Sequence, residues 1–195
     1  MRQRGTARTG IVPPMPAIHG DVGTEIAPET AADPALAAHV DDLLRRVCRL
    51  ARALTGAEQA ALKVDLDGDG VAARKFFTMS ERYDAFRDYR VDPRGLGLHG
   101  MRLAPGEVVR LTQQEVEQHP AWQAFGNQAD KHPPLRGWLA TAVCSEQPGR
   151  ASYGLLQLSD KTGDADFTAQ DADHLRELAA FAGAALDALR HAAAR

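Results

Sequence analysis

The chain has 195 residues, of which 44% are hydrophobic and 25% are charged, proportions that are typical of a globular domain with a sizeable core. The formal net charge of −3 excludes a general attraction to nucleic acid or to an anionic membrane surface, and no apolar run is long enough to span a membrane. The N-terminus lacks the apolar stretch of a secretory signal, and the cysteines lack disulfide or metal-site spacing. We therefore expect a cytoplasmic protein without nucleic-acid or membrane partners.

The first 33 residues are rich in proline and glycine and have no sustained hydrophobic period. This composition predicts a disordered or loosely packed extension, followed by a single domain over residues 34–195. Three arginines make the first ten residues basic. A docking arm is one interpretation of them, and a solvated tail is the simpler one.

The domain begins with a predicted amphipathic helix. Asp33 is suited to cap it and Pro34 to occupy its first position, and apolar residues then recur at steps of three and four as far as Leu54. Gly56 is a natural end, so the helix has about twenty residues.

Residues 59–64 and 71–79 are the next predicted elements, two strands joined by an Asp-Gly turn. The turn resembles the front of a calcium loop. The twelfth position of that loop is Phe76, where a calcium site needs a bidentate glutamate. A β-hairpin turn is therefore favoured over a calcium site.

Residues 80–132, called the insert below, are expected to form little regular secondary structure. Tyr83, Phe86 and Tyr89 are spaced to share one face of a short helix. A short strand is expected to end near residue 111, and Thr112 with Glu115 forms the signature of a capping box at the start of a second short helix. Irregular segments of this length in a compact domain are usually functional.

The last third of the chain predicts two central strands, 137–144 and 153–161, and a long helix capped by Thr168 with Asp171 in its first turn. The expected fold class is therefore α+β. We expect an antiparallel sheet of about five to six strands, with the N- and C-terminal helices on one face and the irregular insert on the other.

Several stretches carry a family resemblance. GLLQLSDK, a short Gly/Asp loop and FTAQDADHLRELAAFAGAAL resemble the C-terminal half of a GAF domain. Upstream, MSERYDAFRDY, RLTQQEVEQHPAWQAFG and HPPLRGWLA resemble the GAF modules of bacterial PAS/GAF sensor histidine kinases. The resemblance implies a sensor fold with a ligand pocket between sheet and insert, and pairing of subunits through the terminal helices. It does not select a ligand, because a shared fold hosts many functions.

The candidate ligand-binding residues are aromatic or carry a polar nitrogen, and they lie in the insert or just after it. They are Tyr83, Phe86, Tyr89, Trp122, Phe125, Trp138, Arg136, His99, His119 and His132. A mixed apolar and polar lining is typical of small-molecule pockets. The simpler alternative is a second hydrophobic core beneath the insert, since that sheet face must be covered in any case. The histidine spacings, 20 and 13 residues, match no local metal motif, so neither a metal nor a cofactor is expected.

The sequence thus predicts a non-catalytic sensor or interaction module of bacterial signal transduction that forms a homodimer. No PAS, kinase or cyclase segment follows Arg195, so output is expected through a separate histidine kinase or another signalling protein. Bilin attachment would need a cysteine in the insert or in a preceding arm, and neither has one.

The alternative is an enzyme, a thiol-dependent reductase similar to the methionine sulfoxide reductase that uses the GAF fold. It requires Cys144 near the pocket and Cys48 within disulfide reach, with Cα atoms less than about 7 Å apart.

Overall fold

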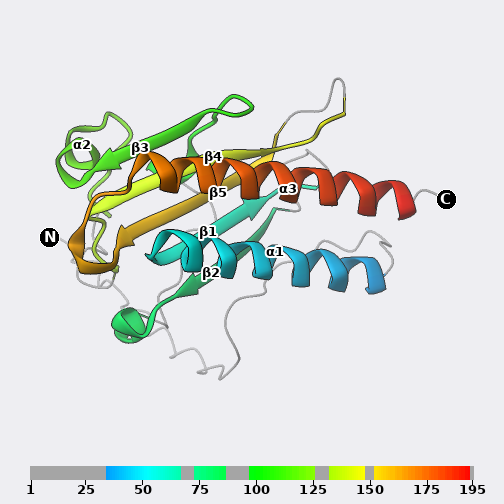
Figure 1. Ribbon diagram of the computed structural model, residues 1–195, viewed down its shortest axis with the longest axis horizontal. Helices are drawn as coiled ribbons and strands as arrows, with labels where there is room; N and C mark the ends of the chain where they lie inside the picture. The colour runs from blue at the N-terminus through cyan, green and yellow to red at the C-terminus, as the bar shows by residue number, and fades with distance from the viewer. Residues whose placement is uncertain (1–33, 67–72, 87–96, 126–131, 148–151, 194–195) are drawn as a thin grey trace, which may run out of the picture.

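The computed structural model describes residues 34–66, 73–86, 97–125, 132–147 and 152–193. A single antiparallel sheet of five strands, in the order β2-β1-β5-β4-β3, forms its centre (Figure 1). The strands are β1 (Ala57–Val64), β2 (Arg74–Met79), β3 (Val108–Thr112), β4 (Gly137–Cys144) and β5 (Ser152–Lys161). The helices are α1 (Pro34–Thr55), α2 (Gln113–Gln118) and α3 (Ala169–Ala193), with 3-10 turns η1 (Glu81–Phe86), η2 (Gly97–Gly100) and η4 (Thr162–Asp164).

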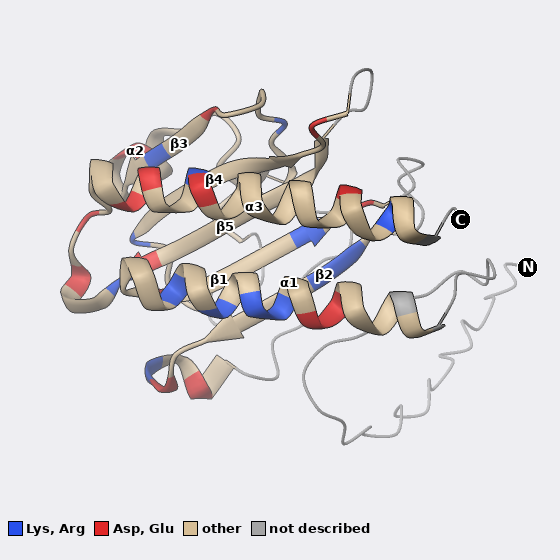
Figure 2. Cartoon of the chain, turned by 45° about the vertical axis from the view of Figure 1, so that its right-hand side comes forward, with Lys and Arg blue, Asp and Glu red and all other residues tan. Residues whose placement is uncertain are grey.

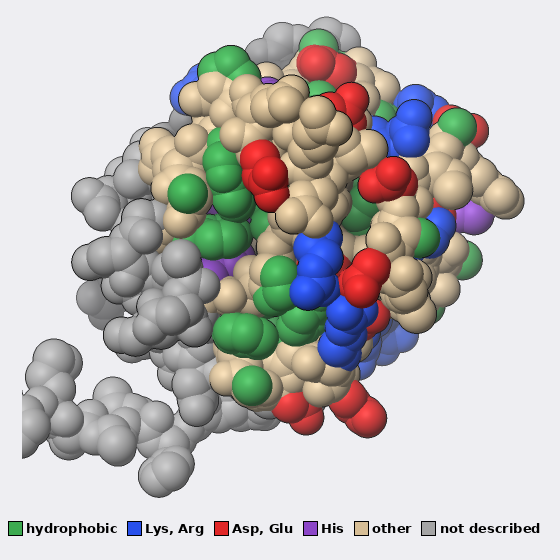
Figure 3. Space-filling view, turned by 90° about the vertical axis from the view of Figure 1, so that its left-hand side faces the viewer, with side chains coloured by type: hydrophobic (Ala, Val, Ile, Leu, Met, Phe, Trp, Pro, Cys, Tyr) green, Lys and Arg blue, Asp and Glu red, His purple; other side chains and the backbone are tan. Residues whose placement is uncertain are grey.

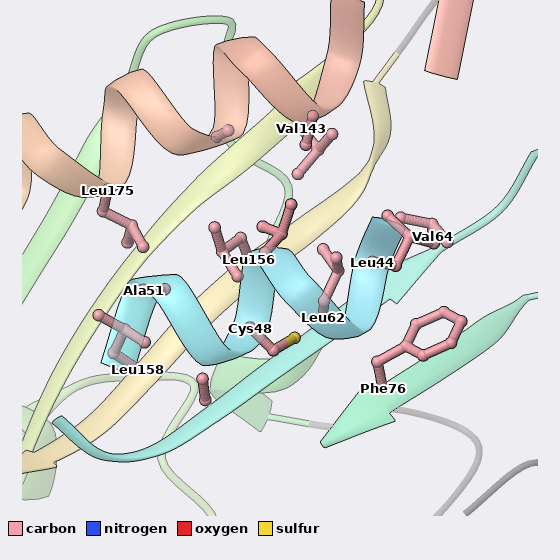
Figure 4. Packing of buried hydrophobic residues seen from close by; sticks show 14 of the residues in the cluster. Leu44, Cys48, Ala51, Leu62, Val64, Phe76, Val143, Leu156, Leu158 and Leu175 are labelled. Atoms are coloured by element: carbon pink, nitrogen blue, oxygen red, sulfur yellow. The ribbon is translucent and has the colours of Figure 1, made fainter. Parts of the chain in front are cut away.

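The two long helices lie side by side across one face of the sheet (Figures 1 and 2), which we call the helix-side face. Its core is built from apolar side chains of both helices and of the strands beneath them. Figure 4 shows Leu44, Cys48 and Ala51 of α1 pointing toward Leu156 and Leu158 of β5, and all five side chains are buried. This layer contains the largest continuous hydrophobic cluster of the described residues.

The close contact between α3 and the sheet depends on Gly183. A Cβ atom built on this glycine would lie 1.9 Å from the carbonyl oxygen of Cys144 at the end of β4, far inside the van der Waals contact distance. Only a residue without a side chain therefore lets the helix backbone approach the strand this closely.

The predicted helix ends are present. Gly56 follows α1 in the left-handed region, at φ +68°, as a helix-terminating glycine does. At the start of α3, the Asp171 backbone N–H donates to Thr168 Oγ1, and the Thr168 N–H donates back to Asp171 Oδ2 at 2.6 Å. Lys161 Nζ contacts the same carboxylate oxygen at 2.5 Å, so the cap also ties the end of β5 to α3.

The predicted fold class is confirmed: the sheet is antiparallel, and both terminal helices cover the same face. The capping box of α2 is also present, with Thr112 as N-cap and Glu115 at the third helical position. The helix expected after residue 80 is instead the 3-10 turn η1, which is kinked at Tyr83. The predictions for residues 1–33 and for the Asp-Gly turn at 67–72 lie outside the described residues, as does Tyr89.

Candidate functional site

The opposite face of the sheet, here the insert-side face, is organised around Trp138. Its side chain is fully buried, and its indole Nε1 donates to Gln157 Oε1 at 3.2 Å on the neighbouring strand. His99, from η2 of the insert, places Nδ1 at 2.9 Å from the same oxygen. The amide oxygen of one buried glutamine therefore joins the sheet to the insert.

This arrangement assigns the protonation state of His99. An indole N–H can only donate, so the atom that it meets is the oxygen of the Gln157 side chain. His99 Nδ1 faces that oxygen as well and must carry a hydrogen. Burial lowers the pKa of His99, although the hydrogen bond to Gln157 opposes this shift. The neutral ring with its proton on Nδ1 satisfies both conditions and leaves the Nε2 lone pair as an acceptor.

An aromatic stack extends from His99 across the insert. The ring of His132 lies with its centroid 6.5 Å from that of His99, at an interplanar angle of 29°, and 3.6 Å from that of Phe125, at an angle of 16°. Phe125 meets Trp122 edge-on at 4.9 Å. Burial lowers the pKa of His132 to about 4, against the opposing effect of the hydrogen bond to the Pro133 carbonyl. Both imidazoles are therefore neutral at pH 7.

Apolar residues of the insert and the sheet complete this cluster. They are Leu98, Leu103, Val116, Leu135, Ala140, Ala142 and Leu155. The insert-side layer thus combines aromatic, imidazole and amide groups with aliphatic side chains. Such a mixture suits the binding of a small molecule.

A second polar cluster lies at the end of β5, around Asp160. Its carboxylate accepts a hydrogen bond from Tyr83 Oη at 2.7 Å and another from the Arg136 backbone N–H at 2.5 Å. Asp160 is 1% exposed and sits in the left-handed region at φ 54°, a conformation that costs energy for most residues other than glycine. Burial raises the pKa of Asp160, and the hydrogen bonds oppose that shift. The carboxylate thus fastens η1 and the start of β4 to β5.

The surface above this cluster carries alternating charges. Asp164 in η4 contacts Arg82 at 2.8 Å and Arg136 at 3.0 Å, and Phe86 packs edge-on against Tyr83 at 6.0 Å. Figure 3 views the molecule from this end and shows basic and acidic side chains next to one another. These groups neutralise each other, so this end of the molecule is a structural clamp.

The structure divides the candidate residues into three groups. His99, Trp122, Phe125, His132 and Trp138 come together in the insert-side cluster. Tyr83, Phe86 and Arg136 belong to the clamp around Asp160 and Asp164. His119 belongs to neither group. It stabilises the turn after α2, because its Nδ1 accepts a hydrogen bond from the Ala121 backbone N–H at 3.1 Å.

Two residues that organise these groups were not predicted, namely Gln157 and Asp160. Both lie on β5, and a buried glutamine within an apolar strand, GLLQLSD, was the available signal. A polar side chain in the middle of a central strand needs a hydrogen-bond partner, and this requirement could have directed attention to the indole and imidazole donors.

The two cysteines are both free and are separated by the sheet. Cys48 belongs to the helix-side core, where burial raises the pKa of its thiol to about 12. Cys144 packs against the insert-side cluster. A thiol held protonated on the far face is a poor nucleophile or resolving partner, which counts against a two-thiol reductase.

The described ranges contain neither a metal-binding cluster nor a membrane-spanning helix. There, no group of three or more His, Cys, Asp or Glu residues is placed to hold a metal ion. No helix in that part of the chain combines the length and apolar character that a membrane span requires.

Comparison with known proteins gives a consistent family assignment. The family model described as GAF domain matches residues 37–187. Among solved structures, the photoproduct state of GAF3 from Slr1393 of Synechocystis sp. PCC6803 is similar with a TM-score of 0.59 and 14% identity, covering 79% of this chain and 97% of that chain.

Two further structures show the same fold similarity. The blue-light absorbing form of the Thermosynechococcus elongatus PixJ GAF domain has a TM-score of 0.52 and 13% identity, with 83% of this chain and 92% of that chain covered. The GAF domain/HD domain protein from Geobacter sulfurreducens has a TM-score of 0.52 and 16% identity, with coverages of 77% and 94%. At these identities the likeness concerns the fold alone.

Proposed function

The chain belongs to the GAF domain family, and we propose that it is a cytoplasmic, non-catalytic sensor or interaction module of bacterial signal transduction. In this proposal residues 34–195 form one domain that binds a small molecule between sheet and insert and pairs with a second copy through α1 and α3. Its output passes through a separate signalling protein, of which a histidine kinase is the first candidate. The resemblance of the insert to GAF modules of sensor histidine kinases supports that partner.

One observation carries the ligand-binding part of the proposal. The sheet places a buried amide, Gln157, under the insert, where it binds Trp138 and His99 together. Polar groups inside an otherwise apolar layer cost stability unless they are hydrogen-bonded, and these three side chains can be satisfied by one another or by a polar ligand. A packing role alone would be served as well by apolar side chains.

A photoreceptor function is not part of the proposal. Several of the similar structures are cyanobacteriochromes, yet covalent attachment of a bilin needs a cysteine in the insert or in a preceding arm. The thiols of this chain are at positions 48 and 144, in α1 and β4. A metabolite held without a covalent bond fits the described residues better.

Ligand binding is tested by thermal unfolding of the full chain against a panel of cyclic nucleotides, amino acids and other metabolites. A ligand at 100 times its Kd stabilises the folded state by about 2.7 kcal/mol, which raises Tm by several degrees in a domain of this size. The Gln157→Leu variant should lose that shift, whereas Arg49→Gln on the outer surface of α1 should keep it. A panel without any shift would favour an interaction-only module.

Dimerisation through the terminal helices is supported by their outer surfaces. Leu50 and Leu54 on α1 are 48% and 51% exposed, and Phe181 on α3 is 59% exposed. A few large apolar side chains on the outside of neighbouring helices are typical of a surface that is covered by a partner. Arg49 adjoins Leu50 in sequence, while Glu177 lies one turn from Phe181, so opposite charges flank the apolar residues.

Sedimentation velocity across micromolar concentrations tests this dimer. We expect the wild type to sediment as a dimer and the Leu54→Glu/Phe181→Glu double variant to sediment as a folded monomer, because each subunit would bring carboxylates into the interface. The matched control is Glu117→Gln on the exposed surface of α2, outside the proposed interface, which should remain dimeric. A wild type that is monomeric at all concentrations would refute the dimer without affecting the ligand site.

A further inference from the structure

The outer surface of each long helix carries one charge that is not compensated within the chain. Among the Asp, Glu and Arg residues of α1 and α3, Arg49 and Glu177 alone make no hydrogen bond or ion pair in the described part of the chain. The others are paired, as Asp42 is with Arg46 at 2.8 Å. Arg49 and Glu177 are both exposed, so each is available to a charge of opposite sign on another molecule.

The two uncompensated charges border apolar side chains. Leu50, Leu54 and Phe181 are the large hydrophobic residues that the described ranges expose, and all three lie on α1 or α3. Arg49 adjoins Leu50 in sequence, and Glu177 precedes Phe181 by four residues, which places these two on the same side of α3. The charges therefore belong to the surface that we propose a second copy covers.

Arg49 and Glu177 also lie at similar heights along the pair of helices, which run in opposite directions (Figure 1). Lys161 connects the end of α1 to the start of α3, because it pairs with Ala57, just after α1, and contacts Asp171 in the first turn of α3. From that shared end, Arg49 is about 9 Å along α1 and Glu177 is about 12 Å along α3, at a rise of about 1.5 Å per residue.

Two-fold symmetry allows two ways of stacking this helix layer on a copy of itself. An axis perpendicular to the helices places α1 on the partner's α1. Since basic residues follow one another along the middle of α1 (Figure 2), that arrangement brings like charges together. An axis parallel to the helices instead places each α1 on the partner's α3 and leaves every height unchanged. Arg49 of each copy then lies opposite Glu177 of the partner subunit.

From this geometry we propose that the dimer forms about a two-fold axis parallel to α1 and α3, with Arg49 of each subunit paired with Glu177 of the partner subunit. The exposed side chains of Leu50, Leu54 and Phe181 are covered in the same contact. This inference rests on the proposed dimerisation and names its arrangement. A two-fold interface makes every contact twice, so each dimer contains two of these ion pairs, and complementary charges of this kind fix how the subunits are aligned.

Reversal of the charges tests the pairing. Arg49→Glu and Glu177→Arg each turn both attractive contacts of the homodimer into like-charge contacts, and the Arg49→Glu/Glu177→Arg double variant makes them attractive again. The dimer Kd of the full chain is measured by sedimentation velocity at low salt, and circular dichroism establishes that each variant is folded. The matched control is Glu117→Arg, which reverses an exposed charge on α2, outside the helix pair.

We expect each single variant to raise the dimer Kd roughly tenfold or more, because attraction becomes repulsion at two exposed contacts. The double variant should return to within about threefold of the wild type, and Glu117→Arg should stay within about twofold.

An equal mixture of the two single variants shows whether the contact lies between subunits. In the mixed dimer both contacts again join opposite charges, so the mixture should dimerise at concentrations at which each variant alone is monomeric. An ion pair within one chain would not respond to mixing.

The outcomes separate the arrangement from dimerisation itself. If the wild type dimerises and neither single variant changes its Kd, the arrangement is wrong while the dimer stands. That result is expected for α1 stacked on α1, where each reversal only exchanges one like-charge contact for another. If the single variants weaken the dimer and neither the double variant nor the mixture restores it, Arg49 and Glu177 do not pair and the inference is overturned. A wild type that is monomeric at all concentrations refutes the proposed dimer and this inference with it.

Discussion

The two faces of the sheet are built from the same strands and differ in chemistry. On the helix-side face, Leu62, Leu139 and Leu156 are completely buried in the larger of the two hydrophobic clusters of the described residues. On the insert-side face, the same strands present Lys63, Trp138 and Gln157. The first face secures the fold by burying apolar area. The second also carries hydrogen-bonded polar groups, and the proposed ligand site lies on this side.

The largest expected effect tests how tightly the helix-side face is packed. Gly183→Val would force a side chain into the carbonyl of Cys144, and overpacking against backbone cannot be relieved by a change of rotamer. We expect a loss of about 3 kcal/mol or more in the free energy of unfolding. Urea denaturation measures it, with Ala180→Val on the exposed side of α3 as the control, which should cost less than about 1 kcal/mol.

Gln157→Leu tests the insert-side face in the same way. The substitution keeps the volume and removes the oxygen that accepts from both Trp138 and His99. Two buried donors lose their partner, so we expect a loss of about 2 kcal/mol. The Gln157→Leu/Trp138→Phe/His99→Phe triple variant removes the donors as well and should recover part of this loss. If the triple variant loses the sum of the separate effects, the three side chains do not act as one network.

The helix-side face was predictable from the sequence, because its signal is periodic. The steps of three and four along α1 and the cap at Thr168 are local patterns, and each element formed where they indicated. The insert-side cluster was predictable only as a set of residue types. No pattern in the neighbouring sequence indicates that His99 contacts a glutamine 58 positions away. Likewise, the cross-strand pairing of Lys63 with Lys75 depends on how β1 and β2 align. Long-range partners of this kind follow from topology.

Lowering the pH should reduce the stability of the protein through a group on the insert-side face. The folded state holds His132 with a pKa of about 4, below the ordinary value near 6.5. The stability from its neutral form is fully present above pH 6.5 and is lost as the pH falls toward 4, because the unfolded chain takes up a proton that the folded chain refuses. We expect this site to cost about 2 kcal/mol at pH 4, allowing for its partial exposure.

The measurement is the free energy of unfolding by urea at a series of pH values between 7 and 4. His132→Phe keeps a ring against Phe125 and should have a shallower slope than the wild type, whereas His39→Gln on the exposed surface of α1 should keep the wild-type slope. Carboxylates titrate in the same pH range and change the slope of every variant. The contribution of His132 is therefore read from the difference between the slopes of the wild type and His132→Phe. Equal slopes for wild type and His132→Phe would contradict the assignment.

The smallest expected effect is a gain in stability, whereas the earlier substitutions cause a loss. Lys63→Gln removes one of two like charges that face each other across β1 and β2, so the protein without ligand should become more stable by about 0.5 kcal/mol. Thermal unfolding at low salt measures this gain, which should shrink at high salt because the repulsion is screened. If Lys63→Gln instead destabilises the protein, the Lys63 side chain makes a net stabilising contact in the folded state.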